Sequence, residues 1–147
     1  MIYIIIAVTV FVGDLLLKNY IEKKKSIGKS EKLLGGKIIV TKYHNEGAFL
    51  NLFEKQKNML LLVSGVMLGM ILMFLFVLMP QKGKKLVKVG VTFLFAGAAS
   101  NVYDRVFRGY VVDYFSFSFL KKVVFNISDI FIFIGSLLLA VWYAVIE

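Results

Sequence analysis

Positions 59–79 contain no charged side chain. The hydrocarbon core of a bilayer is about 30 Å thick and requires about 20 helical residues to cross it. Three further apolar runs cover residues 2–21, 86–103 and 123–146, each interrupted by only a few polar side chains. The sequence therefore predicts a mainly α-helical membrane protein with four transmembrane helices. We expect the first run to be a retained helix rather than a cleaved leader, because it lacks a basic segment before it and a small-residue cleavage site.

The composition agrees with a membrane protein and excludes several kinds of site. Of the 147 residues, 59% are hydrophobic, whereas a soluble domain typically has about 45 to 50%. The chain has no cysteine and one histidine, so it has no thiol nucleophile and no thiolate or histidine-rich metal site. We expect no metal and no other cofactor, and any chemistry must come from carboxylates, lysines, hydroxyl groups or the backbone.

The positive charge is concentrated between the apolar runs. The formal net charge is +9, and Lys18 is the one basic residue deep inside a run. Basic residues at the ends of apolar runs are typical of contact with anionic lipid headgroups, and we expect no nucleic-acid partner. The short segment 80–88 carries four lysines, which by the positive-inside rule places it in the cytoplasm. With four spans, both termini are then expected to be cytoplasmic.

The two connections on the opposite side of the membrane carry β-strand signals. Turn glycines and β-branched or aromatic residues predict a small extracytoplasmic sheet, a cradle, over about residues 33–53, between the first and second helices. Along residues 111–119, alternate side chains share one face, which places Asp113 on the apolar side. We expect residues 1–147 to form a single integral membrane domain.

Polar residues inside the apolar runs gather toward one edge of the membrane. The predicted topology brings the second half of the first run, the end of the third and the start of the fourth to the same outer half. Ionisable groups in lipid cost several kcal/mol and by default indicate a functional site. The residues concerned are Asp14, Lys18, Asn101, Asp104, Asn126 and Asp129, and Asp113 lies in the connection beside them.

Clustered aspartates admit three interpretations. Two adjacent carboxyl groups share a proton, so that one can activate a water molecule while the other polarises a carbonyl group. This arrangement favours hydrolysis of an amide bond. A membrane proton or small-ion carrier and purely structural polar packing are the alternatives. A carrier requires ionisable groups in both leaflets, and the inner half offers only Lys88 at its edge.

Five motifs then occur in chain order. Asp14 and Lys18 form a D-x-x-x-K pattern, residues 45–49 read NEGAF, and residues 101–105 end a run of small residues with N-x-x-D-R. Residues 109–114 read GYVVDY and residues 125–129 read FNISD. Together the five motifs resemble those of the bacterial lipoprotein signal peptidases, also called signal peptidase II, through the whole chain.

The resemblance implies an intramembrane aspartyl endopeptidase. Such an enzyme removes the signal peptide of a prolipoprotein by hydrolysing the peptide bond before the diacylglyceryl-modified cysteine. Its partners would be that substrate and the lipids of the bacterial cytoplasmic membrane, with the active site near the outer face and the protein acting as a monomer. The motifs assign the catalytic pair to Asp113 and Asp129. They assign substrate binding or support of the site to Asp14, Lys18, Asn45, Asn101, Asp104, Arg105 and Asn126.

Three residues depart from the family pattern. Ser100 and Ser128 stand where glycine and alanine are usual, and His44 stands where arginine is common. We expect the Ser128 hydroxyl to donate a hydrogen bond to the adjacent Asp129.

Two ion pairs are also expected. The guanidinium of Arg105 should keep its neighbour Asp104 ionised. Asp14 and Lys18 are four residues apart, so they should form an ion pair along one helix face.

Overall fold

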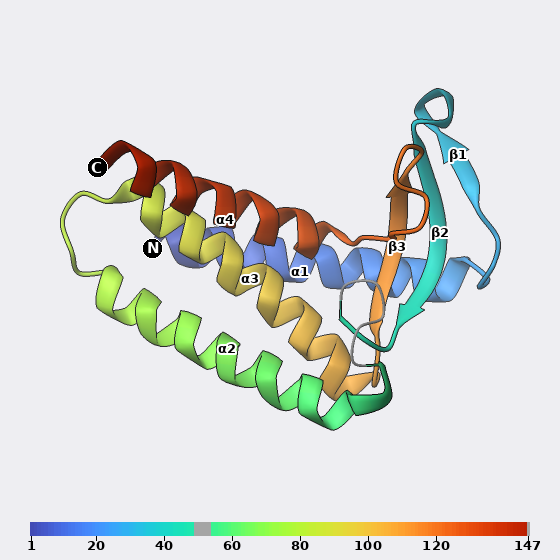
Figure 1. Cartoon of the computed structure of the whole chain (residues 1–147), viewed down its shortest axis with the longest axis horizontal. Coiled ribbons are helices and arrows are strands. Elements are labelled where there is room, and N and C mark those ends of the chain that lie inside the picture. Colours follow the sequence, from blue (N-terminus) through green and yellow to red (C-terminus); the bar gives the residue numbers. More distant parts are fainter. Residues whose placement is uncertain (49–53, 147) are drawn as a thin grey trace.

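Four long helices dominate the computed structural model, which describes residues 1–48 and 54–146 (Figure 1). All four are long and apolar enough to cross a membrane, which confirms the predicted fold class. Both termini and the connection between the second and third helices lie at the same end of the bundle (Figure 1). The helices are α1 (Ile2–Lys24), α2 (Lys57–Leu78), α3 (Lys85–Phe107) and α4 (Ile127–Ile146).

The helix ends differ from the predicted ends by a few residues. Helices α1 and α3 continue to Lys24 and Phe107, beyond the apolar runs. Helix α4 begins at Ile127 instead of residue 123, because Phe125 pairs with Phe115 in an isolated antiparallel bridge. The segment before α4 is therefore held by the sheet, and the first turn of α4 starts directly after it.

The predicted small sheet is present and has three antiparallel strands. They are β1 (Glu31–Leu33), β2 (Ile38–Asn45) and β3 (Val111–Phe117), in the order β1-β2-β3. The alternating segment after α3 thus supplies the third strand, as its pattern indicated. Residues 49–53 of the predicted β region, including Phe49 of the NEGAF motif, lie outside the described residues. The strands run across one end of the bundle, opposite the termini (Figure 1).

Helix α3 has the largest buried share of the four helices. Its close approach to α4 depends on glycine. A Cβ atom on Gly97 would lie 2.5 Å from the Ser128 carbonyl oxygen, and one on Gly135 would lie 2.5 Å from the Gly90 carbonyl oxygen. Such contacts are shorter than any side chain tolerates. Gly97 therefore lets α3 lie directly against the start of α4, near the polar residues, and the Gly90–Gly135 contact keeps the two helices close farther along.

Candidate active site

Asp113 and Asp129 line one cavity at the sheet end of the bundle. Asp113 comes from β3 and is 2% exposed, and Asp129 lies in the first turn of α4. The cavity has a volume of about 470 Å³ and is lined by residues of β2, α3, β3 and α4. The two carboxyl groups that the motifs indicated thus come from different elements and face the same space.

Asn126 connects the two aspartates. Its side-chain oxygen accepts a hydrogen bond from the Asp129 backbone N–H at 2.9 Å, and its own backbone N–H donates to Asp129 Oδ2 at 3.1 Å. This reciprocal pair is a capping box that starts α4. The Asn126 side-chain nitrogen donates to Asp113 Oδ1 at 2.7 Å. The buried Asn126 therefore caps the start of α4 and also holds the carboxyl group of Asp113.

Two further asparagines hold the remaining carboxylate oxygens. Asn101 Nδ2 donates to Asp129 Oδ1 at 2.9 Å, and Asn45 Nδ2 donates to Asp113 Oδ2 at 3.0 Å. Asn101 Oδ1 in turn accepts from Asn126 Nδ2 at 3.1 Å. Because amides orient carboxylates without adding charge, both aspartates are held in place while their protonation stays free to change.

Burial is the main influence on Asp113. It disfavours the charged form, and the nearby Asp129 carboxylate adds repulsion, so the pKa of Asp113 is raised to about 7. The hydrogen bonds from Asn45 and Asn126 act in the opposite direction. Two such carboxyl groups titrate as a pair that holds one proton over an intermediate pH range. This is the state that general acid–base chemistry requires.

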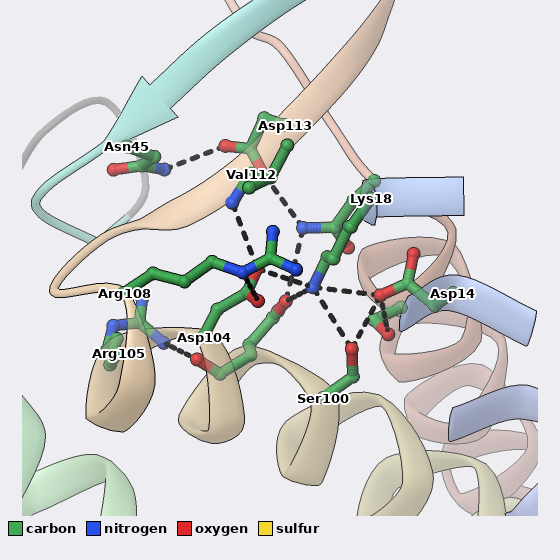
Figure 2. A network of polar contacts seen from close by, with 12 residues as sticks. Asp14, Lys18, Asn45, Ser100, Asp104, Arg105, Arg108, Val112 and Asp113 are labelled. Carbon is green, nitrogen blue, oxygen red and sulfur yellow. Dashed lines mark hydrogen bonds and ion pairs between the residues drawn. The ribbon is translucent and has the colours of Figure 1, made fainter. Parts of the chain in front are cut away.

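A buried ionic network supports the cavity from the helix side. Lys18 Nζ lies 2.8 Å from Asp14 Oδ2 and 3.2 Å from Asp104 Oδ2, and all three side chains are fully buried. Figure 2 shows the Lys18 side chain reaching between the two carboxylates. Lys18 Nζ also donates to Ser100 Oγ and to Asn101 Oδ1, both at 3.0 Å. The predicted ion pair between Asp14 and Lys18 is confirmed, and it is connected to the asparagines that hold the aspartates.

The network also fixes the strand that carries Asp113. Asp104 Oδ2 accepts a hydrogen bond from the backbone N–H of Val112 at 3.0 Å. The Tyr114 hydroxyl donates to Asp14 Oδ1 at 2.8 Å and accepts from the Ile127 backbone N–H at 3.0 Å. The residues on both sides of Asp113 are thus tied to helices α1, α3 and α4.

Arg105 attracts Asp104 only at longer range and forms no direct ion pair with it. Asp104 lies instead beside Lys18 and beside Arg108, whose Nε is 3.3 Å from Asp104 Oδ1. Consecutive side chains on a helix point in different directions, whereas residues four apart share a face. Arg105 accordingly points to the cavity and donates from NH2 to the Gly47 carbonyl oxygen at 3.1 Å.

The expected bond from Ser128 to Asp129 was also wrong. Ser128 Oγ donates to Asp14 Oδ2 at 2.6 Å, because its side of α4 faces α1 and α3. Ser100 Oγ donates to the same oxygen at 2.7 Å. Ser100 and Ser128 therefore both bond Asp14.

All nine site residues predicted from the motifs are brought together at the cavity or in the network behind it. Sequence reasoning missed the contributions of Ser100, Arg108 and Tyr114. The spacing of four between Asp104 and Arg108 was the one available signal for these three. Within residues 1–48 and 54–146, no group of three or more His, Asp or Glu side chains is placed to hold a metal ion.

The chain matches the family model of signal peptidase (SPase) II over residues 6–145. It is 30% identical over 140 residues to the lipoprotein signal peptidase of Lactobacillus johnsonii, covering 95% of this chain and 90% of that protein. Identity to the lipoprotein signal peptidase of Lactococcus lactis subsp. lactis is 33% over 136 residues, covering 92% of this chain and 89% of that protein.

Solved structures agree with these sequence matches. A bacterial membrane enzyme determined by the in meso method at 2.3 Å resolution superposes with a TM-score of 0.88 at 28% identity, covering 97% of this chain and 87% of the other. A second such enzyme, at 1.9 Å resolution, gives a TM-score of 0.85 at 29% identity, covering 96% of this chain and 91% of the other. The fold, the cavity with its two aspartates and these matches agree, and the chain therefore belongs to the signal peptidase II family of aspartic peptidases.

Proposed function

We propose that Asp113 and Asp129 are the catalytic pair with which this multi-pass membrane protein removes signal peptides from prolipoproteins. The observation that carries the proposal is the arrangement of the two carboxyl groups. They come from β3 and α4, face one cavity, and each accepts hydrogen bonds from two asparagines. Such a site can bind a peptide bond and a water molecule between an acid and a base.

In the proposed reaction, the pair enters with one shared proton. The ionised carboxylate takes a proton from water as the water oxygen bonds to the carbonyl carbon, while the protonated carboxyl group donates to the carbonyl oxygen. The protonated carboxyl group then donates its proton to the nitrogen as the C–N bond breaks. The other carboxylate takes a hydroxyl proton from the tetrahedral intermediate as the carbonyl group re-forms. The pair again holds one proton at the end, so no covalent intermediate is needed.

The lining of the cavity supports a substrate that is partly lipid. Ile132 and Phe133 of α4 contribute apolar surface, and Arg105 contributes a cation. Diacylglyceryl chains would remain in the bilayer beside α4, and the guanidinium would contact the substrate backbone. The bond cleaved would be the one before the diacylglyceryl-modified cysteine.

The charge distribution supports an orientation with the site near the outer face of a bacterial cytoplasmic membrane. The lysine-rich α2–α3 connection and both termini lie at the end of the bundle away from the sheet (Figure 1). By the positive-inside rule, that end would be cytoplasmic. Because the chain has no cysteine, a single cysteine placed at exposed Lys82 or Lys37 tests this. An impermeant reagent applied to whole cells should label position 37 and spare position 82.

A monomer is also proposed, because the bonds that hold Asp113 and Asp129 all arise within one chain. A crosslinking or light-scattering measurement on the active, detergent-solubilised protein tests this. Full activity in a fraction of monomer mass is expected. Activity confined to fractions of dimer mass would contradict it.

Incubation of the purified protein with a diacylglyceryl-modified prolipoprotein tests the function. Mass spectrometry of the products should show cleavage directly before the modified cysteine, and the same polypeptide without the lipid should be cut far more slowly. Cleavage elsewhere, or of both substrates alike, would contradict the proposed specificity. Proton flux through protein-containing liposomes without any peptide cleavage would favour the alternative carrier.

A further inference from the structure

Strand β2 presents different side chains to the cavity and to helix α1. Successive residues of a strand point to opposite faces. Asn45 and Tyr43 line the cavity, whereas His44 and Lys42 face Glu22, near the C-terminal end of α1. The residue that bonds Asp113 and the residue that bonds α1 are therefore direct neighbours in the chain.

His44 is held from two sides. Its Nε2 lies 2.6 Å from Glu22 Oε1, and its ring stacks on that of Tyr110 with centroids 3.9 Å apart and planes 20° from parallel. Tyr110 belongs to the short connection between α3 and β3. The side chains of His44 and Glu22 are about three-quarters buried, at 25% and 22% exposure. His44 thus joins α1, β2 and the start of β3.

Lys42 is a second partner of Glu22, and its contacts do not involve His44. Lys42 Nζ lies 2.7 Å from Glu22 Oε2 and donates to the Glu22 backbone carbonyl at 3.0 Å. Glu22 therefore uses one carboxylate oxygen for Lys42 and the other for His44. Loss of either side chain leaves the other bond in place, so the two positions can be compared directly.

The contacts of His44 act on the site through Asn45. In the register of the sheet, His44 lies opposite Val112 and Asn45 lies opposite Val111. These two valines directly precede Asp113 in β3. Asn45 Nδ2 then donates to Asp113 Oδ2 at 3.0 Å. We propose that His44 is a positioning residue: by bonding Glu22 and stacking on Tyr110, it fixes the end of β2 so that Asn45 can orient the Asp113 carboxyl group.

The inference rests on the proposed catalytic role of Asp113. It goes beyond that role by naming His44 as the residue that positions the hydrogen bond from Asn45 to Asp113. The Asn45 bond stabilises the ionised form of Asp113, so its loss moves the titration of the pair to higher pH. Loss of a bond of ordinary strength should shift the pH–rate profile by about half a unit to one unit. A residue that acts only in general packing has no reason to shift this profile.

The test compares His44→Ala, Asn45→Ala and the double variant in prolipoprotein cleavage as a function of pH. Both single variants should lower kcat, leave KM nearly unchanged and shift the profile to higher pH. The double variant should match Asn45→Ala, because His44 acts through Asn45. His44→Arg, which keeps a hydrogen-bond donor for Glu22, should restore most of the activity. Lys42→Gln is the matched control and should leave the profile unshifted.

Additive effects of the two substitutions would overturn the inference, as would a change confined to KM or a loss of activity with an unshifted profile. If His44→Ala does not fold, His44→Phe retains an aromatic ring for Tyr110, deletes the bond to Glu22, and should show the same shift. Asp113→Asn separates this inference from the proposed function. If Asp113→Asn retains cleavage, the proposed function fails. If Asp113→Asn is inactive but the effects of His44→Ala and Asn45→Ala are additive, only the role of His44 is contradicted.

Discussion

The side-chain nitrogen of Asn126 lies 2.7 Å from Asp113 Oδ1, so that a single amide joins the start of α4 to the middle of β3. The same asparagine exchanges two hydrogen bonds with Asp129 at the first turn of the helix. The start of α4 and the relative placement of the two carboxyl groups are therefore set together. Substitutions that separate these two roles of Asn126 show how far activity depends on each.

Asn126→Ser should keep the cap and lose the contact with Asp113. Serine is a good N-cap residue, but its side chain is too short to reach the strand. Hydrogen bonds to charged groups contribute about 1.5–3 kcal/mol, which corresponds to roughly a 10- to 100-fold lower kcat. Asn126→Ala loses the cap as well and should be about 1 kcal/mol less stable than the serine variant. Equal kcat in Asn126→Ser and the wild type would show that this contact does not orient Asp113.

Lys18 should be essential for stability, because it is the cation shared by two buried carboxylates. Lys18→Met leaves Asp14 without its counter-ion and leaves Asp104 with Arg108 alone. Breaking a buried pair in this way typically costs about 3–5 kcal/mol. Thermal unfolding in detergent measures the loss. Lys57→Met is the control, because the ion pair of Lys57 with Glu46 is about half exposed and such pairs contribute about 0–1 kcal/mol. Similar Tm values for the two variants would contradict the proposed support by Lys18.

Ser128→Ala should affect stability without affecting the titration of the active site. The Ser128 hydroxyl donates to Asp14, which also bonds Lys18, Ser100 and Tyr114. Loss of one donor among several should cost about 1 kcal/mol and leave the pH–rate profile in place. Ser64→Ala, which removes a bond to a carbonyl within α2, is the matched control for a serine in a membrane helix. A shifted profile in Ser128→Ala alone would mean that this hydroxyl acts on Asp129 after all.

The raised pKa of Asp113, at about 7, predicts that the stability of the wild type depends more strongly on pH than that of Asp113→Asn. The folded protein binds this proton more tightly than the unfolded chain, so its contribution to stability is present at low pH and is lost as pH rises through about 7. Cleavage should also fall at high pH, because the pair then loses the proton that its two carboxyl groups share.

Asp113→Asn carries no such charge, so its Tm should change less with pH than that of the wild type. Thermal unfolding between pH 5 and pH 9 measures this difference. A wild-type Tm that rises through this range would contradict the buried, shared proton.

The sequence could predict which residues belong to the site, but not which neighbouring element the side chain of a helical residue faces. Apolar runs and alternation located the four helices and the strand that carries Asp113. The partner of Asp104 was mistaken because Lys18, on another helix, is reached only once α1 and α3 pack together. Ser128 was mistaken for the same reason, since its hydroxyl reaches Asp14 of α1 only once the helices pack together.

Cleavage of the lipidated prolipoprotein by Asp113→Asn and Asp129→Asn, under single-turnover conditions, tests the central claim most directly. Amides keep the shape of the carboxyl groups but cannot exchange the proton. Loss of general acid–base catalysis should lower the rate of each variant by about 100- to 10,000-fold. Glu46→Gln, at a half-exposed carboxylate, should keep the wild-type rate. Wild-type cleavage by either aspartate variant would contradict the assignment of Asp113 and Asp129 as the catalytic pair.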